Sequence, residues 1–152
     1  MHETIRVGEM SVTFLKTRHE TGGVFDLFEF TMPAFHRVPF SHIHRKYDET
    51  IFGVDGSTTW TLDGKPTEVR RGVTLFIPRG TPHSYANPTH APGRVLCLQT
   101  PGVIGPEYYL EIAALYYRGC HPDLASLGTI MSRYGVVPVH QKEDLLPFQP
   151  ER

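Results

Sequence analysis

The sequence has no excess of charge of either sign and no long apolar run. Its 152 residues include 15 Lys and Arg and 16 Asp and Glu, so the formal net charge is −1 with histidine counted as neutral. A chain without a basic stripe cannot displace the counterions of nucleic acid, and nothing attracts it to an anionic membrane. No apolar stretch approaches the roughly 20 residues of a membrane-spanning helix. We therefore predict that its partners include neither nucleic acid nor a membrane.

Cysteine is scarce as well. Cys97 and Cys120 form neither a CxxC pair nor a disulfide framework, which favours two unreactive thiols. The N-terminal sequence MHETIRVGEM lacks the apolar core of a signal peptide, so we expect a cytoplasmic protein. With 39% hydrophobic and 20% charged residues, the composition suits a soluble globular protein, and we place one domain over residues 1–152.

Glycine and proline, in contrast, are frequent and spread along the chain, with 14 and 13 residues respectively. Between them lie short segments rich in Val, Ile, Thr, Phe or Tyr, a pattern typical of strands that end in turns. Asp55-Gly56 and Asp63-Gly64 indicate hairpins, because both central positions of a type I′ turn need positive φ. Regularly spaced short strands favour an all-β barrel or sandwich. The predicted strands cover residues 12–16, 24–31, 50–54, 58–62, 67–70, 74–77, 84–86 and 94–99.

The pattern changes after Pro101, where two segments have apolar residues at helical spacing. The first covers residues 107–117 and the second runs from residue 122 to about residue 134; a proline opens each, and a glycine follows each. The first contains four tyrosines and is expected to pack on the outside of the barrel, with a lid over its mouth or a dimer contact as alternatives. We predict a barrel at about residues 5–100 and a helical tail at about residues 105–140.

The most informative feature is a group of potential metal ligands framed by turn residues. The first three lie in His42-x-His44-x4-Glu49-x6-Gly56. Two histidines that are two residues apart share one face of a strand. Glu49 has an odd offset from His44, so the strand must bend or bulge within residues 45–48 for all three side chains to meet.

A fourth potential ligand, His83, lies in a second frame, Gly72-x5-Pro78-x-Gly80-x2-His83-x3-Asn87. The glycines and the proline stand where turns are needed to bring His83 from another strand to the first three ligands. Three imidazoles and one carboxylate suit one divalent transition metal per chain, which the residue types leave open as Fe, Mn, Ni, Co or Zn. Four protein ligands leave two octahedral positions for water, dioxygen or a chelating substrate.

The two frames resemble the two motifs of the cupin superfamily, G(x)5HxH(x)3-4E(x)6G and G(x)5PxG(x)2H(x)3N. The match covers about residues 39–87, and His36 stands where the first motif begins with glycine. Residues 121–124 and 133–135 are more loosely similar to the tail of quercetin-dioxygenase-like single-domain cupins. The resemblance implies a double-stranded β-helix, the cupin jelly-roll barrel, with two C-terminal α-helices, and it implies a homodimer.

The resemblance also implies roles for individual residues. His42, His44, Glu49 and His83 become the metal ligands, and Glu49 is either a ligand alone or also the general base. The implied activity is that of a mononuclear metal-dependent dioxygenase acting on a small aromatic or chelating organic substrate. Because a fold does not fix a reaction, a non-redox isomerase, hydrolase or decarboxylase and a non-catalytic small-ligand-binding cupin remain alternatives.

Aromatic residues near the potential ligands are candidates for substrate binding. Phe52, Trp60 and Tyr85 alternate within predicted strands, so one face of each strand would line the barrel, and Tyr47 lies two residues before Glu49. Such side chains would give an apolar pocket, although ordinary core packing is the other interpretation.

Overall fold

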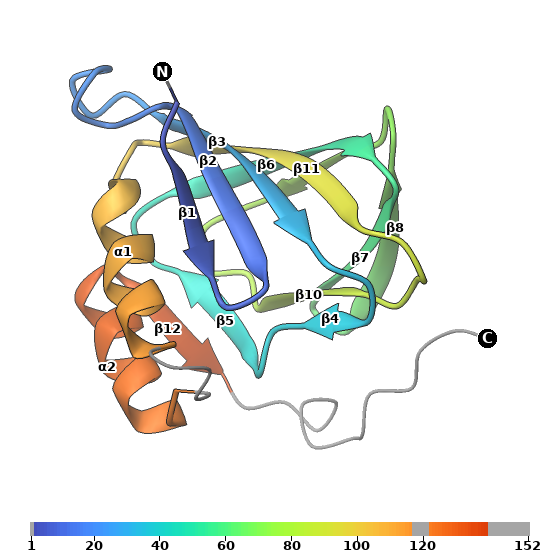
Figure 1. Ribbon diagram of the computed structural model, residues 1–152. Helices are drawn as coiled ribbons and strands as arrows, with labels where there is room; N and C mark the ends of the chain where they lie inside the picture. Colours follow the sequence, from blue (N-terminus) through green and yellow to red (C-terminus); the bar gives the residue numbers. More distant parts are fainter. Residues whose placement is uncertain (1, 117–121, 140–152) are drawn as a thin grey trace.

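Two antiparallel sheets wrap around a common core and form the body of the molecule (Figure 1). The computed structural model describes residues 2–116 and 122–139. One sheet has the strand order β1-β2-β3-β11-β6-β9; the other has the order β12-β5-β10-β7-β8, with β4 paired to β10. The prediction of an all-β double-stranded β-helix with two C-terminal helices is confirmed. The strands are β1 (Thr4–Val7), β2 (Met10–Lys16), β3 (Asp26–Met32), β4 (His36–Arg37), β5 (Ser41–His44), β6 (Asp48–Asp55), β7 (Ser57–Leu62), β8 (Lys65–Arg70), β9 (Thr74–Ile77), β10 (His83–Asn87), β11 (Gly93–Thr100) and β12 (Val136–Val139).

Alternation along the strands places the core inside the barrel. In β3, Phe28, Phe30 and Met32 are buried while the side chains between them are partly exposed. Each of the eight strands expected from the sequence corresponds to an observed strand, with boundaries displaced by no more than two residues. The short strands β1, β4 and β12 are not among the strands predicted from the sequence.

The two Asp-Gly pairs have different structures. Asp63 and Gly64 have φ values of 48° and 76°, and they join the paired strands β7 and β8 as a hairpin. The hairpin predicted at Asp55-Gly56 is wrong, because β6 and β7 belong to different sheets and only Gly56 has positive φ. A Cβ atom on Gly56 would lie 2.3 Å from the carbonyl oxygen of Pro92, so this crossing between sheets requires glycine.

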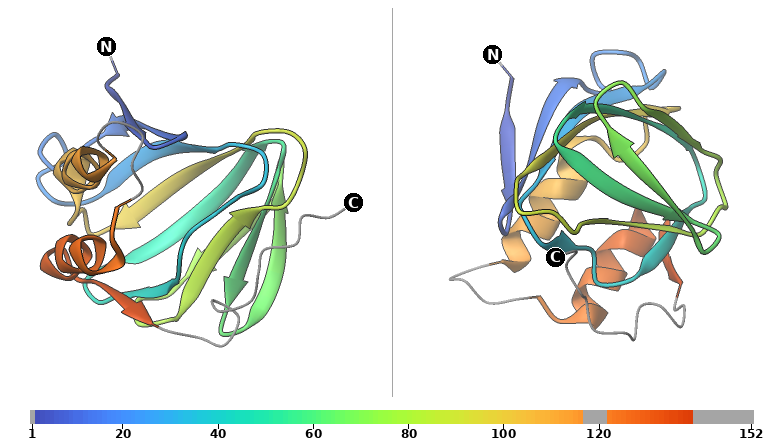
Figure 2. Two further views of the ribbon diagram at one scale, coloured as in Figure 1. Left: turned by 60° about the horizontal axis from the view of Figure 1, so that its bottom comes forward. Right: turned by 90° about the vertical axis from the view of Figure 1, so that its right-hand side faces the viewer.

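Two helices, α1 (Gly105–Leu115) and α2 (Leu124–Arg133), lie side by side against one end of the barrel (Figures 1 and 2). Pro106 stands in the first turn of α1, and the side chain of Asp123 caps α2 by accepting a hydrogen bond from the Ser126 amide at 2.8 Å. The predicted end of the first helix, at residue 117, lies outside the described residues. Neither helix is long and apolar enough to span a membrane, nor is any other helix in the described part of the chain.

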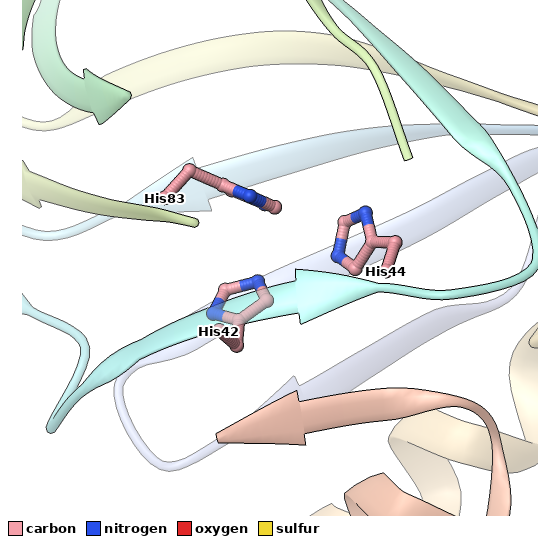
Figure 3. A group of neighbouring side chains, drawn as sticks. All are labelled: His42, His44 and His83. Carbon is pink, nitrogen blue, oxygen red and sulfur yellow. The ribbon is translucent and has the colours of Figure 1, made fainter. Parts of the chain in front are cut away.

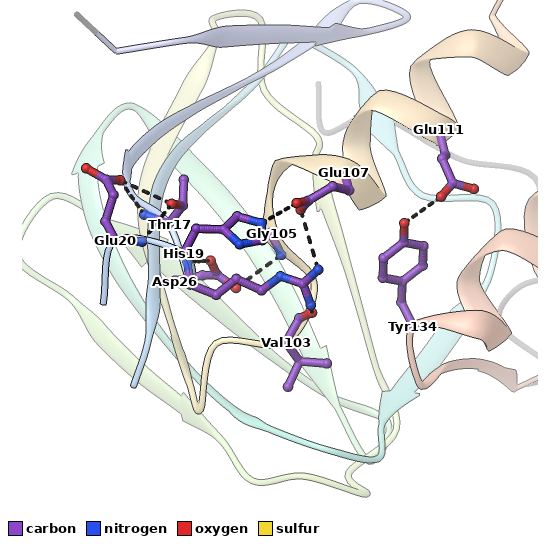
Figure 4. A network of polar contacts seen from close by, with 10 residues as sticks. Thr17, His19, Glu20, Asp26, Val103, Gly105, Glu107, Glu111 and Tyr134 are labelled. Atoms are coloured by element: carbon purple, nitrogen blue, oxygen red, sulfur yellow. Dashed lines mark hydrogen bonds and ion pairs between the residues drawn. The ribbon is translucent and has the colours of Figure 1, made fainter. Parts of the chain in front are cut away.

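Polar contacts fix α1 to the loop between β2 and β3 (Figure 4). The buried carboxylate of Asp26 accepts hydrogen bonds from the Arg18 amide at 2.6 Å and from the Gly105 amide at 3.1 Å. Glu107 contacts both Arg18 and His19. These contacts hold the first turn of α1 over the barrel rim.

A second group of contacts joins the two helices. Glu111 of α1 accepts a hydrogen bond from the Tyr134 hydroxyl at 2.5 Å and is paired with Arg133 at the end of α2. The ring of Tyr108 packs edge-on against Tyr134, with centroids 5.3 Å apart. The helices therefore cover the barrel end as one connected unit.

Candidate metal centre and its pocket

Three histidines from two paired strands converge inside the barrel (Figure 3). His42 of β5 lies directly opposite His83 at the start of β10, and His44 follows two residues later on the same face of β5. One ring nitrogen from each histidine can be chosen so that all three lie within 4.8 Å of one another, and all three side chains are buried. The predicted convergence of these three residues is thus observed.

The hydrogen bonds of the histidine rings leave nitrogens free for a metal. His83 donates its Nδ1 proton to the Thr81 carbonyl oxygen at 2.9 Å, so its Nε2 carries a lone pair. His83 Nε2 and His44 Nδ1 are both buried and have no hydrogen-bond partner among the described residues. An unpaired buried nitrogen costs about 1–3 kcal/mol, and a metal ion would remove that cost. The donor set therefore fits a divalent transition metal.

Burial also keeps the imidazoles in the neutral form that metal binding requires. It lowers the pKa of His83 to about 4, while a hydrogen bond to the Thr81 backbone opposes that shift. Burial also lowers the pKa values of His42 and His44 well below 6.5, and each is lowered further by the charges of neighbouring histidines. All three rings are therefore neutral at pH 7.

Glu49 reaches the histidines from the opposite sheet. Its Oε2 lies 3.8 Å from both His44 Nδ1 and His83 Nε2, and its Oε1 accepts a hydrogen bond from Gln99 Nε2 at 2.9 Å. Burial raises the pKa of Glu49 to about 7, against the lowering effect of the Gln99 hydrogen bond. Glu49 thus stands beside the three-histidine group, where a fourth ligand or a proton acceptor would be placed.

The irregularity expected at residues 45–48 takes the form of a crossing between sheets. β5 ends at His44 in one sheet, and β6 begins at Asp48 in the other. This crossing offsets the odd spacing from His44 to Glu49 and lets both side chains face the interior. Asp48 then accepts hydrogen bonds from the Arg79 amide at 2.8 Å and from its guanidinium at 3.2 Å, which ties the crossing to the turn before His83.

The turn before His83 is held to the ligand strand as well. Gly80, at φ 80°, donates its amide hydrogen to the His44 carbonyl oxygen at 2.8 Å. The second frame of the sequence therefore acts as expected, because its glycine permits the conformation that places His83 opposite His42.

Three of the four predicted aromatic residues line the pocket beside the histidines: Tyr47, Trp60 and Tyr85. The Tyr47 ring stacks on His44 with centroids 4.3 Å apart. Tyr85 packs edge-on to His42 at 6.3 Å and lies 4.7 Å from the Trp60 ring. These rings form an apolar wall next to the candidate metal centre.

Phe52, the fourth predicted residue, does not reach the pocket. Glu49 and Ile51 of β6 are buried and face the interior, so the side chain of Phe52 points to the outer face of the sheet. Phe52 is partly exposed and is absent from the pocket wall. Its position next to an inward-facing residue in a strand explains the difference.

The helices provide part of the pocket wall, a role that the sequence pattern offers only as an alternative, as a lid over the barrel mouth. The pocket includes Gln99 and Cys97 of β11, and it leaves about 90 Å³ accessible to the centre of a water molecule. Burial raises the pKa of the free Cys97 thiol well above its usual range, in keeping with an unreactive cysteine, whereas Cys120 lies outside the described residues.

The first helix packs on the barrel as predicted, and it also closes the pocket. The helical residues that line it are Tyr108, Tyr109, Ile112, Leu127 and Met131, and Tyr116 at the C-cap of α1 lines it as well.

Two other motif positions have structural roles away from the pocket. Asn87 is buried, and its side-chain amide donates to carbonyl oxygens of Met32, Pro33 and Ala91, which fixes the turn after β10. His36 stands where the first cupin motif begins with glycine. The positive φ that a glycine would adopt easily falls one residue earlier, at Phe35, which has a φ of 57°.

The fold and the buried histidine group define a double-stranded β-helix protein that is able to hold a metal ion inside its barrel. The family model of the Cupin domain matches residues 28–99 of the chain. The matched segment contains His42, His44, Glu49 and His83.

Individual relatives share parts of the chain. It is 29% identical over 119 residues to quercetin 2,3-dioxygenase of Bacillus subtilis, covering 78% of this chain and 34% of that protein. It is 35% identical over 60 residues to an uncharacterised protein of Methanocaldococcus jannaschii, covering 40% of this chain and 48% of that protein. The chain thus spans between a third and a half of these relatives. A predicted oxalate decarboxylase from Thermotoga maritima has the same fold, with a TM-score of 0.59 at 19% identity over 66% of this chain and 92% of that one.

Proposed function

We propose that the protein is a mononuclear metal-dependent dioxygenase acting on a small organic substrate that chelates the metal. The observation that carries this proposal is the buried group of His42, His44 and His83 with Glu49 beside it, next to an aromatic pocket that His42, His44 and Glu49 help to line. The partial similarity to quercetin 2,3-dioxygenase supports the same reaction class. In an oxidative ring or C–C cleavage of this class, the organic substrate supplies all four electrons that reduce dioxygen, so the reaction needs no external reductant.

The metal would be held by the three histidines, with Glu49 as a fourth ligand or as a base. Fe, Mn, Ni, Co and Zn all suit this donor set. When bound, such an ion supplies Lewis acidity and, if it is redox-active, reactivity toward dioxygen.

The protein's own groups would prepare the substrate. Glu49 is held by the Gln99 amide and is placed to accept a proton from a substrate hydroxyl next to the histidines. The rings of Tyr47, Trp60 and Tyr85 would orient the substrate body and exclude water. Glu49 and these three aromatic residues are our candidates for catalysis and substrate binding.

Oxygen uptake after metal exchange tests the proposal. The protein is stripped with chelator, reconstituted anaerobically with each metal in turn, and mixed with a panel of phenols and diketones. The proposal expects uptake that depends on Fe, Mn, Co or Ni and is lost in Glu49→Ala. Turnover that continues without oxygen and with Zn would select a non-redox isomerase, hydrolase or decarboxylase. Ligand binding with no turnover would select a binding cupin.

We also propose that two chains form a homodimer in the cytoplasm. The support for association is an apolar strip on the outer face of one sheet. Leu98 of β11 pairs with Thr50 of β6, which pairs with Phe76 of β9, and the Phe76 side chain is 56% exposed on this edge strand. Light scattering that gives the mass of one chain would contradict the dimer.

A further inference from the structure

We infer that the pocket selects a ligand of single-ring size that carries no fixed negative charge beyond its metal-binding group and that donates a hydrogen bond to the side-chain carbonyl of Gln99. This inference rests on the proposed metal site and narrows its substrate class. Three independent features of the pocket support it: its volume, its charges and its unpaired acceptor.

The volume limits the ligand to about one ring. The cavity volume is about 90 Å³. An engineered apolar cavity of about 150 Å³ binds benzene, so this volume suits a ligand of no more than about one ring. Ile112 of α1 and Met131 of α2 are both buried and form part of the wall. The helices, which are fixed to each other through Glu111, therefore limit the depth of the pocket.

The charges exclude polyanions. Among the described residues that line the pocket there is no lysine and no arginine, and the only carboxylate is Glu49. A phosphate group or a second carboxylate would therefore be buried against apolar rings without a cation to offset its desolvation.

The unpaired acceptor specifies a donor on the ligand. Gln99 is 1% exposed and lines the pocket, and its Nε2 donates to Glu49 Oε1. Its Oε1 has no hydrogen-bond partner among the described residues. If the Gln99 amide were turned over, its carbonyl oxygen would face the Glu49 carboxylate, and two acceptors would oppose each other. Nε2 therefore faces Glu49, and Oε1 is left to accept a hydrogen bond. A ligand hydroxyl next to the metal-binding group would satisfy it.

Binding to the Co²⁺-loaded protein under anaerobic conditions tests this without turnover. Ligands are titrated while the visible absorption of Co²⁺ is followed. Pyrogallol offers a chelating pair of hydroxyls and a third, spare hydroxyl, whereas 3-methoxycatechol is the same ring with the same chelating pair and that third hydroxyl methylated. We expect pyrogallol to bind about tenfold more tightly or better, because 3-methoxycatechol leaves the Gln99 carbonyl unpaired. Gallate, which is pyrogallol with an added carboxylate, glucose 6-phosphate and the three-ring quercetin should all bind more weakly than pyrogallol.

Single substitutions test which residue is responsible for the hydrogen bond to the ligand and which residues limit the size of the pocket. In Gln99→Leu, the ratio of pyrogallol to 3-methoxycatechol affinity should fall toward one while Co²⁺ is still bound. Naphthalene-2,3-diol, with two fused rings, should bind better to Ile112→Ala and Met131→Ala than to the wild type. Leu124→Ala is the matched control on α2, since Leu124 is 55% exposed and outside the pocket. The wild-type ligand series stands on its own if the helix variants do not fold.

Several outcomes would overturn the inference. They are equal binding of pyrogallol and 3-methoxycatechol, tight binding of gallate, glucose 6-phosphate or quercetin, and no response to any ligand. Failure to bind Co²⁺ would overturn both the inference and the proposed metal site. If the ligands bind in the expected order but no oxygen is consumed, only the proposed dioxygenase activity is refuted.

Discussion

Replacing Glu49 with glutamine should abolish a loss of stability that the protein, stripped of metal by a chelator, undergoes as pH rises. The pKa of Glu49 rises from 4.5 to about 7 in the folded chain, chiefly because the carboxylate is desolvated. A raised pKa means that the contribution of this group is fully present below pH 4.5 and is lost as pH rises through about 7. At about 1.4 kcal/mol per pKa unit, the upper bound on that loss is about 3 kcal/mol.

The three histidines act in the opposite direction. The lowered pKa of His83, about 4, gives a contribution that is present above pH 6.5 and is lost as pH falls through 4. These residues are the same in both proteins, so the difference between Glu49→Gln and wild type isolates the carboxylate. Urea unfolding in chelator between pH 4.5 and pH 7 measures that difference. The variant should gain up to about 3 kcal/mol on the wild type across this range. An advantage that stays constant with pH would refute the assignment of a desolvated carboxylate.

Three further substitutions test the scaffold. His83→Ala should weaken metal binding by more than the roughly 10–100-fold typical of groups that only support a ligand, as measured by elemental analysis after dialysis. Arg79→Ala should weaken metal binding by up to about tenfold through the turn before His83, but it should change the free energy of unfolding by no more than about 1 kcal/mol because the Asp48 pair is exposed. Gly56→Ala should destabilise the fold by more than about 2 kcal/mol, because its Cβ would meet the Pro92 carbonyl oxygen at 2.3 Å.

Each substitution has its own control. His90→Ala changes an exposed histidine and should leave metal content unaltered. For Arg79, unchanged metal affinity would show that the turn does not depend on its contact with Asp48. Gly64→Ala also falls at positive φ, 76°, but a Cβ there has nothing within 4 Å. It should cost only about 1 kcal/mol, and equal costs at both glycines would contradict the steric argument.

The three histidines could be predicted from sequence because each lies in a frame of local turn residues. His42 and His44 share a strand face by spacing alone, and Gly80 marks the turn that delivers His83. Asp55-Gly56 misleads for a related reason. The pair encodes a tight turn, but whether the flanking strands pair with each other is decided by the partners that each finds elsewhere.

The rest of the pocket depends on contacts between distant segments. Gln99 lies opposite Glu49 in the register of β11 and β6, and no local pattern around residue 99 indicates that pairing. The helical wall is equally remote, since amphipathic spacing shows that α1 buries one face but not which part of the barrel it covers. Phe52 shows a limit of a different kind, because an error of one position along a strand moves a side chain to the other face.

The register of β12 has a consequence for how the site comes into being during synthesis. Val136 and Pro138 of this strand lie opposite His44 and His42, so β5 has its second neighbour only after residues 136–139 have left the ribosome. Until then the strand that carries two of the three histidines has one edge open to solvent and to other nascent chains. The ion is therefore expected to load only after residue 139 has been synthesised. Starvation for metal should then leave a complete but empty barrel and not a stalled folding intermediate.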